Sequence, residues 1–206
     1  MVSISTCFFD DNPDRLDTIR EVAINHLLAS PLPTAEVTVR GDCLGAFQLE
    51  FDYLCRTLRR LGVPAADIED VAHEVFLVLH RRWEDYDPSC ALRPWLFGIA
   101  FRVAASHRRR SAREVPHGWL DIEDSGREPE QAVAAAQART IVLAALEEVP
   151  LARRAVLVMH DLDDASMHDI ATSLSIPLFT AYSRLRKARK EFETAVRQLQ
   201  KRANKR

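Results

Sequence analysis

The chain has 206 residues, of which 47% are hydrophobic and 28% charged, with a formal net charge of −2. These are ordinary values for a globular protein, and they exclude a collagen-like, a wholly disordered or a disulfide-packed chain. The length suits one or two compact domains. The scarcity of glycine, with only 6 residues, argues against a β-sandwich or a β-barrel.

The near-neutral net charge hides an uneven distribution. From Tyr182 to Arg206 the chain is strongly basic and only Glu191 and Glu193 oppose the basic residues. A second basic run, Arg102–Arg113, contains no acid. The first forty-odd residues and the stretch Asp121–Glu130 are acidic. Two basic faces of this kind favour contact with nucleic acid.

Other features indicate a cytoplasmic protein. None of the four cysteines forms a CxxC pair, which fits free thiols in a reducing compartment. No apolar run approaches the ~18 residues of a membrane span, so no membrane insertion is expected. Residues Met1–Asp10 lack the basic start and the long apolar core of a signal peptide.

The N-terminal part, residues 1–41, is an extension of unknown role, with a short helix expected over Arg15–Leu28. Residues 42–114 predict a helical domain. Its first helix carries apolar residues at steps of three and four from Leu44 through Phe51 to Leu61. A second helix is expected over about Asp67–Trp83, and a third from near Pro94.

Residues 115–130, rich in proline, glycine and acids, predict a flexible linker. Residues 131–206 predict a second helical domain, so the expected fold is all-α with two small domains. Here Ser166 and Asp169 have the spacing of a capping box before a short helix. A turn at Ser175–Pro177 and a long basic helix follow, which is the helix-turn-helix arrangement.

The long helix is expected to point polar and basic side chains outward, where arginine and lysine can reach guanine edges in the major groove and others can contact phosphates. The candidate residues for duplex DNA are Tyr182, Ser183, Arg184, Arg186, Lys187 and Arg189.

This C-terminal segment resembles the fourth conserved region of bacterial sigma factors, closest to the extracytoplasmic-function group. The residues that carry the resemblance are Ile170, Ala171, Leu174–Pro177, Thr180 and Ser183–Arg189. An independent resemblance, to the second conserved region, rests on Asp67–Asp70, His73–Phe76, Trp95–Ala100 and Arg108–Arg110. Together they cover about Gly45–Arg113 and Ala132–Leu199.

The resemblance implies a dissociable subunit that guides RNA polymerase core to promoter DNA, usually under control of an anti-sigma protein. By this analogy the polymerase-binding residues are Asp70, Glu74, Phe76, Leu77, Arg81 and Arg82. The residues expected to bind the proximal promoter element, both as duplex and as melted strand, are Arg102, Ser106, Arg109 and Arg110. The second domain would read the distal element. The family pattern usually has asparagine where Arg102 stands and glycine where Phe179 stands, so the turn at Phe179 must suit a negative φ or carry strain.

Several alternatives stay open. Trp95 and Phe97 could be base-stacking platforms, with Phe101, or core residues. Asp70 and Glu74 could simply favour the N-terminal half of a helix. The chain could instead be a helix-turn-helix regulator that is not a polymerase subunit, or a helical module for an acidic protein partner.

Enzymatic motifs are lacking: His73-Glu74 is not part of an HExxH sequence, and there is no phosphate-binding loop. We therefore expect no catalytic residue, no metal site and no cofactor.

Overall fold

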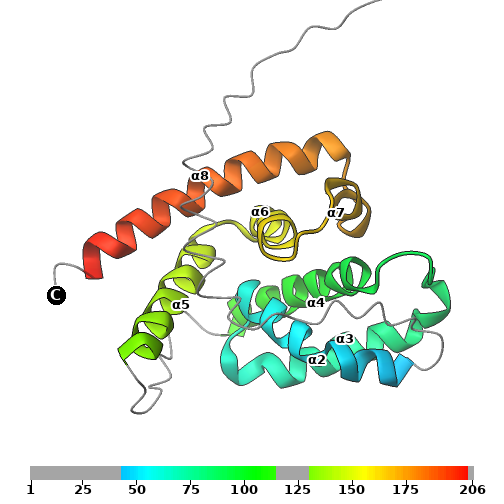
Figure 1. The fold of residues 1–206 in the computed structure, drawn as a ribbon. Helices are drawn as coiled ribbons and strands as arrows, with labels where there is room; N and C mark the ends of the chain where they lie inside the picture. The colour runs from blue at the N-terminus through cyan, green and yellow to red at the C-terminus, as the bar shows by residue number, and fades with distance from the viewer. Residues whose placement is uncertain (1–42, 115–129, 204–206) are drawn as a thin grey trace, which may run out of the picture.

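The computed structural model of the protein describes residues 43–114 and 130–203. The predicted helix over Arg15–Leu28, the N-terminal extension and the linker lie outside these ranges. Every regular element in the described part is helical, which confirms the all-α prediction. Element labels follow Figure 1.

The first domain consists of α2 (Cys43–Arg60), α3 (Ile68–Arg81) and α4 (Leu92–Glu114), with 3-10 turns at Ala65–Asp67 and Trp83–Asp85. Helix α2 ends in a Schellman motif: Gly62 has φ +82°, its N–H donates to Arg59 O, and Val63 N–H donates to Leu58 O. Glycine suits this left-handed position because it has no Cβ. Acidic residues in the first turn of α3 and basic ones in its last turn complement the helix dipole.

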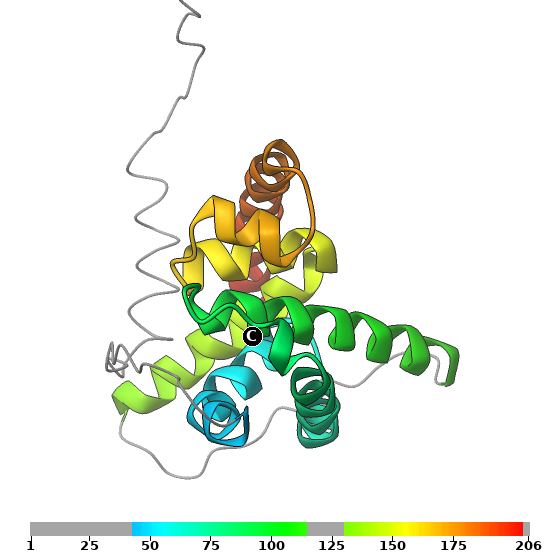
Figure 2. The same cartoon turned by 90° about the vertical axis from the view of Figure 1, so that its right-hand side faces the viewer.

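The second domain consists of α5 (Glu130–Glu148), α6 (Leu151–Leu157), a π-helical turn (Val158–Leu162), α7 (Met167–Ser173) and α8 (Leu178–Ala203). Figures 1 and 2 show α2 and α3 as the layer farthest from α8, with α4 next and α6 and α7 between α4 and α8. Within the described residues, the helices predicted from periodicity are thus present, with ends shifted by a few residues. Trp83, expected on the second helix, instead lies in the 3-10 turn after it.

One continuous apolar core runs through both domains. In the first domain it includes Leu54, Leu58 and Phe97, and in the second Val156 and Ile170, all fully buried. The predicted apolar stripe of α2 is only partly correct, because Leu44 and Phe51 are 47% and 38% exposed. The C-terminal half of α2 packs in the core, whereas Leu44, Leu49 and Phe51 present apolar side chains to solvent.

Candidate nucleic-acid interface

The helix-turn-helix forms as its sequence predicts. Ser166 Oγ accepts the Asp169 N–H at 3.1 Å and donates to Asp169 Oδ2 at 2.7 Å, so the N-terminus of α7 is capped. The turn after α7 is a second Schellman motif, in which Ser175 and Ile176 donate to Thr172 O and Ala171 O. Ser175 holds the left-handed conformation with φ +54°, whereas Phe179 lies inside α8.

The outer face of α8 carries most of the predicted duplex-binding residues. Tyr182 is 50% exposed, Arg186 and Lys187 are exposed, and Ser183 and Arg184 are half-buried. Ala181, Leu185 and Ala188 occupy the opposite face and are buried. At the start of α8, Leu178 and Phe179 are also exposed, Phe179 to 83%. Neither of these two residues is among the candidates predicted from the sequence.

Arg189 differs from the rest of this set because it points into the second domain. Its Nε and Nη2 donate to Asp161 Oδ2 and Oδ1 at 3.0 and 2.7 Å, and Asp161 also bonds to His160 Nδ1. Burial raises the pKa of Asp161, but the hydrogen bonds from His160 and Arg189 outweigh burial and hold that pKa below its ordinary value. Arg189 therefore joins α8 to the π-helical turn.

The predicted proximal-element residues lie on two faces of α4. Arg102, Ser106 and Arg109 are four and three residues apart, so they share one side of the helix, where Arg102 and Arg109 are exposed. Arg102 already has partners: Nη1 donates to Gly98 O at 2.8 Å, and Nη2 donates to Ser173 O at 3.1 Å and Ser175 Oγ at 3.2 Å. The last two bonds reach the second domain.

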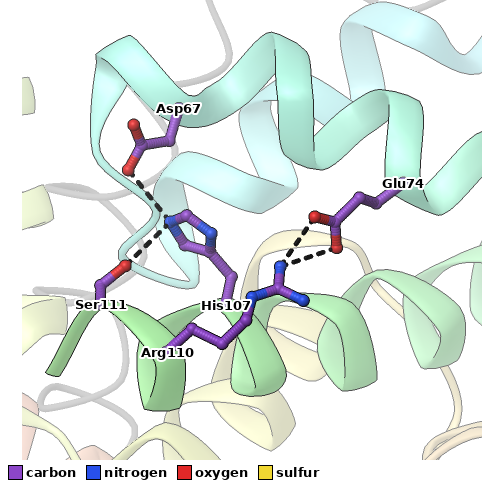
Figure 3. A network of polar contacts seen from close by, with 5 residues as sticks. All are labelled: Asp67, Glu74, His107, Arg110 and Ser111. Carbon is purple, nitrogen blue, oxygen red and sulfur yellow. Dashed lines mark hydrogen bonds and ion pairs between the residues drawn. The ribbon is translucent and has the colours of Figure 1, made fainter. Parts of the chain in front are cut away.

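Arg110 faces α3 (Figure 3). Its Nη2 donates to both carboxylate oxygens of Glu74, at 2.7 and 2.9 Å. One turn away, His107 Nε2 lies 3.0 Å from Asp67 Oδ2 and 3.4 Å from Ser111 Oγ. Although the basic run contains no acid in sequence, the fold places Glu74 of α3 and Asp67 of the preceding 3-10 turn beside it.

The predicted polymerase-binding residues Asp70, Glu74, Leu77 and Arg81 form one stripe along α3, because they are spaced by four, three and four residues. Phe76 is not on this stripe: it packs on Phe47 of α2, with ring centroids 4.8 Å apart. Arg82 follows the helix and donates to Asp85 Oδ2 at 3.1 Å. The exposed Leu44, Leu49 and Phe51 of α2 add apolar surface that was not predicted from the sequence.

The candidate base-stacking residues separate into two kinds. Phe97 is fully buried, so it is a core residue in this structure. Trp95 is half-buried in an aromatic group, with ring centroids 5.1 Å from Tyr86 and 6.3 Å from Trp83. Phe101 is partly buried against the core.

Within residues 43–114 and 130–203 there is no group of three or more His, Cys, Asp or Glu side chains placed to hold a metal ion. Over the same ranges, no helix combines the length and the apolar character that a membrane crossing requires.

Comparison with protein families gives two matches. Residues 48–114 match sigma-70 region 2, and residues 139–192 match sigma-70 region 4. Among curated relatives, the ECF RNA polymerase sigma-E factor of Escherichia coli K12 is 27% identical, over 66% of this chain and 78% of the relative. The RNA polymerase sigma factor NccH of Alcaligenes xylosoxydans xylosoxydans is 28% identical, over 66% and 76%.

Solved structures support the same fold. The sigma factor RpoE, crystallised with the anti-sigma factor NepR from Bartonella quintana, aligns over 75% of this chain and 96% of its own, with 17% identity and a TM-score of 0.61. CnrH in complex with the cytosolic domain of CnrY aligns over 74% and 85%, with 19% identity and a TM-score of 0.51. With both regions matched in their order along the chain, the protein belongs to the extracytoplasmic-function group of the sigma-70 family of RNA polymerase sigma factors.

Proposed function

We propose that this protein binds RNA polymerase core, directs it to specific promoters and starts transcription there, without a catalytic step of its own. The observation that carries the proposal is the presence of both sigma regions, each with exposed cations on a helix. Residues 42–114 act as the polymerase-docking and promoter-opening domain, and residues 131–206 read the distal element. Its site of action is the cytoplasm.

Core polymerase docks on the outer stripe of α3, with Asp70, Glu74, Leu77 and Arg81 as its contacts. A stripe that combines charged side chains with the exposed Leu77 suits a reversible protein interface. The exposed Leu44, Leu49 and Phe51 of α2 are a second candidate for protein contact, since exposed apolar patches commonly mark protein interfaces.

Promoter DNA meets two helices. Helix α8 enters the major groove of the distal element, where Arg186 and Lys187 contact base edges and Arg184 contacts phosphate. Phe179 and Leu178, at the end of the helix that enters the groove first, offer apolar contact to a thymine methyl group. On α4, Arg102 and Arg109 contact the phosphates of the proximal element, where the strands separate.

An anti-sigma protein controls this activity. Among the matched structures, RpoE is bound to the anti-sigma factor NepR, and CnrH is bound to the cytosolic domain of CnrY. We extend that mode of control to this chain because its two domains have the same fold.

The decisive experiment is run-off transcription with purified core polymerase, this chain and a promoter library. A sigma factor yields promoter-dependent transcripts from core polymerase alone. Transcripts that need a holoenzyme already supplied with another sigma factor would instead identify a conventional regulator.

A further inference from the structure

Helices α2 and α3 share an aromatic face that is exposed to solvent. We propose that the segment Arg15–Leu28, which precedes α2 in the chain, binds this face as an amphipathic helix. The contact lies within one chain and within the part of it that contains α2 and α3. It therefore does not rest on the proposed function.

The face forms because α2 and α3 run side by side in opposite directions. Phe47 of α2 packs against Phe76 of α3, with ring centroids 4.8 Å apart. Further along α2, Cys55 lies near Glu69, an earlier residue of α3: burial raises the pKa of the Cys55 thiol, and the charge of Glu69 adds to the rise. Phe51 occupies the same side of α2 as Phe47 and Cys55, because the three residues are spaced by four.

Aromatic rings continue across the face from one helix to the other. The Phe47 ring centroid lies 5.7 Å from that of Phe51, and the Phe76 centroid lies 6.0 Å from His80 and 6.4 Å from His73. Phe51 is 38% exposed, and both histidines are exposed. A run of rings between two helices is a surface that the apolar side of a third helix can cover.

The sequence of the segment has the matching pattern. Apolar residues spaced by three or four share one side of a helix, and in this segment they are Leu16, Ile19, Ala23 and Leu27. The opposite side carries Thr18, Glu21 and Asn25. Isolated helices shorter than about 12–15 residues are marginal in water, so a helix of this length needs an apolar partner.

The length of the connecting chain favours this occupant over a second copy of the protein. Residues 29–42 lie between the segment and Cys43, the first residue of α2. Fully extended they span about 46–50 Å, whereas Cys43 and Cys55 are about 18 Å apart along α2. Pro31 and Pro33 interrupt helical structure, which lets the chain reverse. A tether this short gives an effective concentration on the order of millimolar.

Thiol labelling of the full-length chain tests the contact, because Cys55 is half-buried at one end of the face. Cys90, which is exposed in the loop before α4, is the internal reference. Peptide mass spectrometry gives the labelling rate at each cysteine. A docked segment lowers the rate at Cys55 and leaves the rate at Cys90 unchanged.

Two pairs of substitutions in the segment are compared. The test pair, Ile19→Asp with Leu27→Asp, places charges on its apolar side. The control pair, Thr18→Asp with Asn25→Asp, adds the same charges to the opposite side. The test pair should raise the rate at Cys55 relative to Cys90, up to about tenfold if about nine tenths of the wild-type molecules are docked. The control pair should leave the ratio of the two rates unchanged.

The reciprocal test changes the face and follows the segment. Phe51→Ala should speed amide exchange over residues 15–28, because it removes the exposed ring from the centre of the face. Leu49→Ala is the matched control: Leu49 is also an exposed apolar residue of α2, but it lies about 200° around the helix from Phe51. Leu49→Ala should leave the exchange of the segment unchanged.

A Cys55 labelling rate that is the same in the wild type and in both pairs of variants would overturn the docking. Equal exchange of the segment in Phe51→Ala and Leu49→Ala would also overturn it. Protection of Cys55 that falls on dilution, with dimers seen by light scattering, would assign the face to a second copy and contradict the proposal. None of these measurements uses polymerase or DNA, so promoter-directed transcription tests the proposed function separately.

Discussion

Arg110 of α4 and Glu74 of α3 form an ion pair, in which one guanidinium nitrogen bonds to both carboxylate oxygens at 2.7 and 2.9 Å. The proposed function assigns Glu74 to polymerase, and the resemblance to sigma region 2 predicts that Arg110 contacts promoter DNA. The pair therefore couples the two surfaces. Polymerase contact with Glu74 would release Arg110 for a phosphate, and a phosphate contact of Arg110 would release Glu74 for polymerase. Both side chains are about half exposed, so the coupling is small, below about 1 kcal/mol.

Replacing Glu74 by glutamine should weaken core polymerase binding and strengthen binding of the free chain to single-stranded DNA, because Arg110 loses its competing carboxylate. The gain in DNA affinity should stay within about fivefold, the equivalent of about 1 kcal/mol. Fluorescence anisotropy at low salt measures it. Glu69→Gln, at an exposed acid in the first turn of α3, is the control. An equal gain in both variants would show that only net charge matters.

Replacing Arg186 and Lys187 by alanine should weaken binding to the distal element by about 1–3 kcal/mol for each base contact that the substitutions remove. Footprinting of the holoenzyme at that element measures the change. Arg197→Ala is the matched control, because Arg197 lies further along α8 and pairs with Glu193. Protection that is unchanged in the double variant would remove both residues from the interface.

Phe179 predicts a specific dependence on a thymine methyl group in the distal element. Replacing the contacted thymine by deoxyuridine should cost about 0.8 kcal/mol with the wild-type protein, the value of one buried methyl-sized group. With Phe179→Ala the same DNA change should cost nothing. Competition binding with DNAs in which one thymine of the distal element at a time is replaced measures this difference. Equal costs for both proteins at every position would contradict a contact between Phe179 and a thymine methyl group.

Arg189→Ala should lower the free energy of unfolding by about 1–3 kcal/mol, because it leaves the carboxylate of Asp161 mostly buried without its main donor. Denaturant unfolding measures the change. Arg197→Ala should cost no more than about 0.5 kcal/mol, since its i,i+4 pair is exposed. If Arg189 mainly contacted phosphate, its replacement would reduce the salt dependence of DNA binding and leave the free energy of unfolding unchanged.

The ion pair between Arg189 and Asp161 also predicts that the free energy of unfolding depends on pH. The pKa of Asp161 is lower in the folded protein than its ordinary value, so its stabilising effect is complete above about pH 4 and is lost as the pH falls through the folded pKa. The stability difference between wild type and Arg189→Ala should therefore narrow below about pH 4. A difference that stays constant down to about pH 2 would contradict this role.

Ser175 carries the backbone strain of the helix-turn-helix, with φ +54°. Ser175→Gly should be more stable than Ser175→Ala by about 1 kcal/mol, because both variants lose the hydroxyl that Arg102 bonds to but only glycine suits this conformation. Thermal unfolding of the two variants measures the difference. Equal stabilities would mean that the turn rearranges on substitution.

Local sequence rules were enough to predict the helices and the outer, DNA-facing side of α8. The capping pair Ser166 and Asp169 marked the start of α7, and apolar spacing of three and four residues placed Arg186 and Lys187 on the outer face of α8. These predictions work because hydrogen bonds and side-chain neighbours within a helix are separated by three or four residues.

The same rules failed for side chains whose partners are distant in sequence. Arg189 and Arg110 have the appearance of solvated cations in sequence, yet their partners lie 28 and 36 residues away. The strained residue of the turn is Ser175, not Phe179, because the hydrogen bonds that end α7 determine which residue turns left-handed. Exposure of Leu44 and Phe51 likewise depends on how far α3 and α4 cover α2.

The sequence by itself determined an all-helical chain with two sigma regions and the exposed face of its recognition helix, since these follow from periodicity and from short motifs. Only the tertiary structure decided which charged residues are engaged: Asp163 with Arg60, Asp161 with Arg189, Glu74 with Arg110, and Arg102 with the turn of α7. The physical reason is that an ion pair requires two groups within about 3–4 Å, and for distant residues that separation is set by the packing of whole helices.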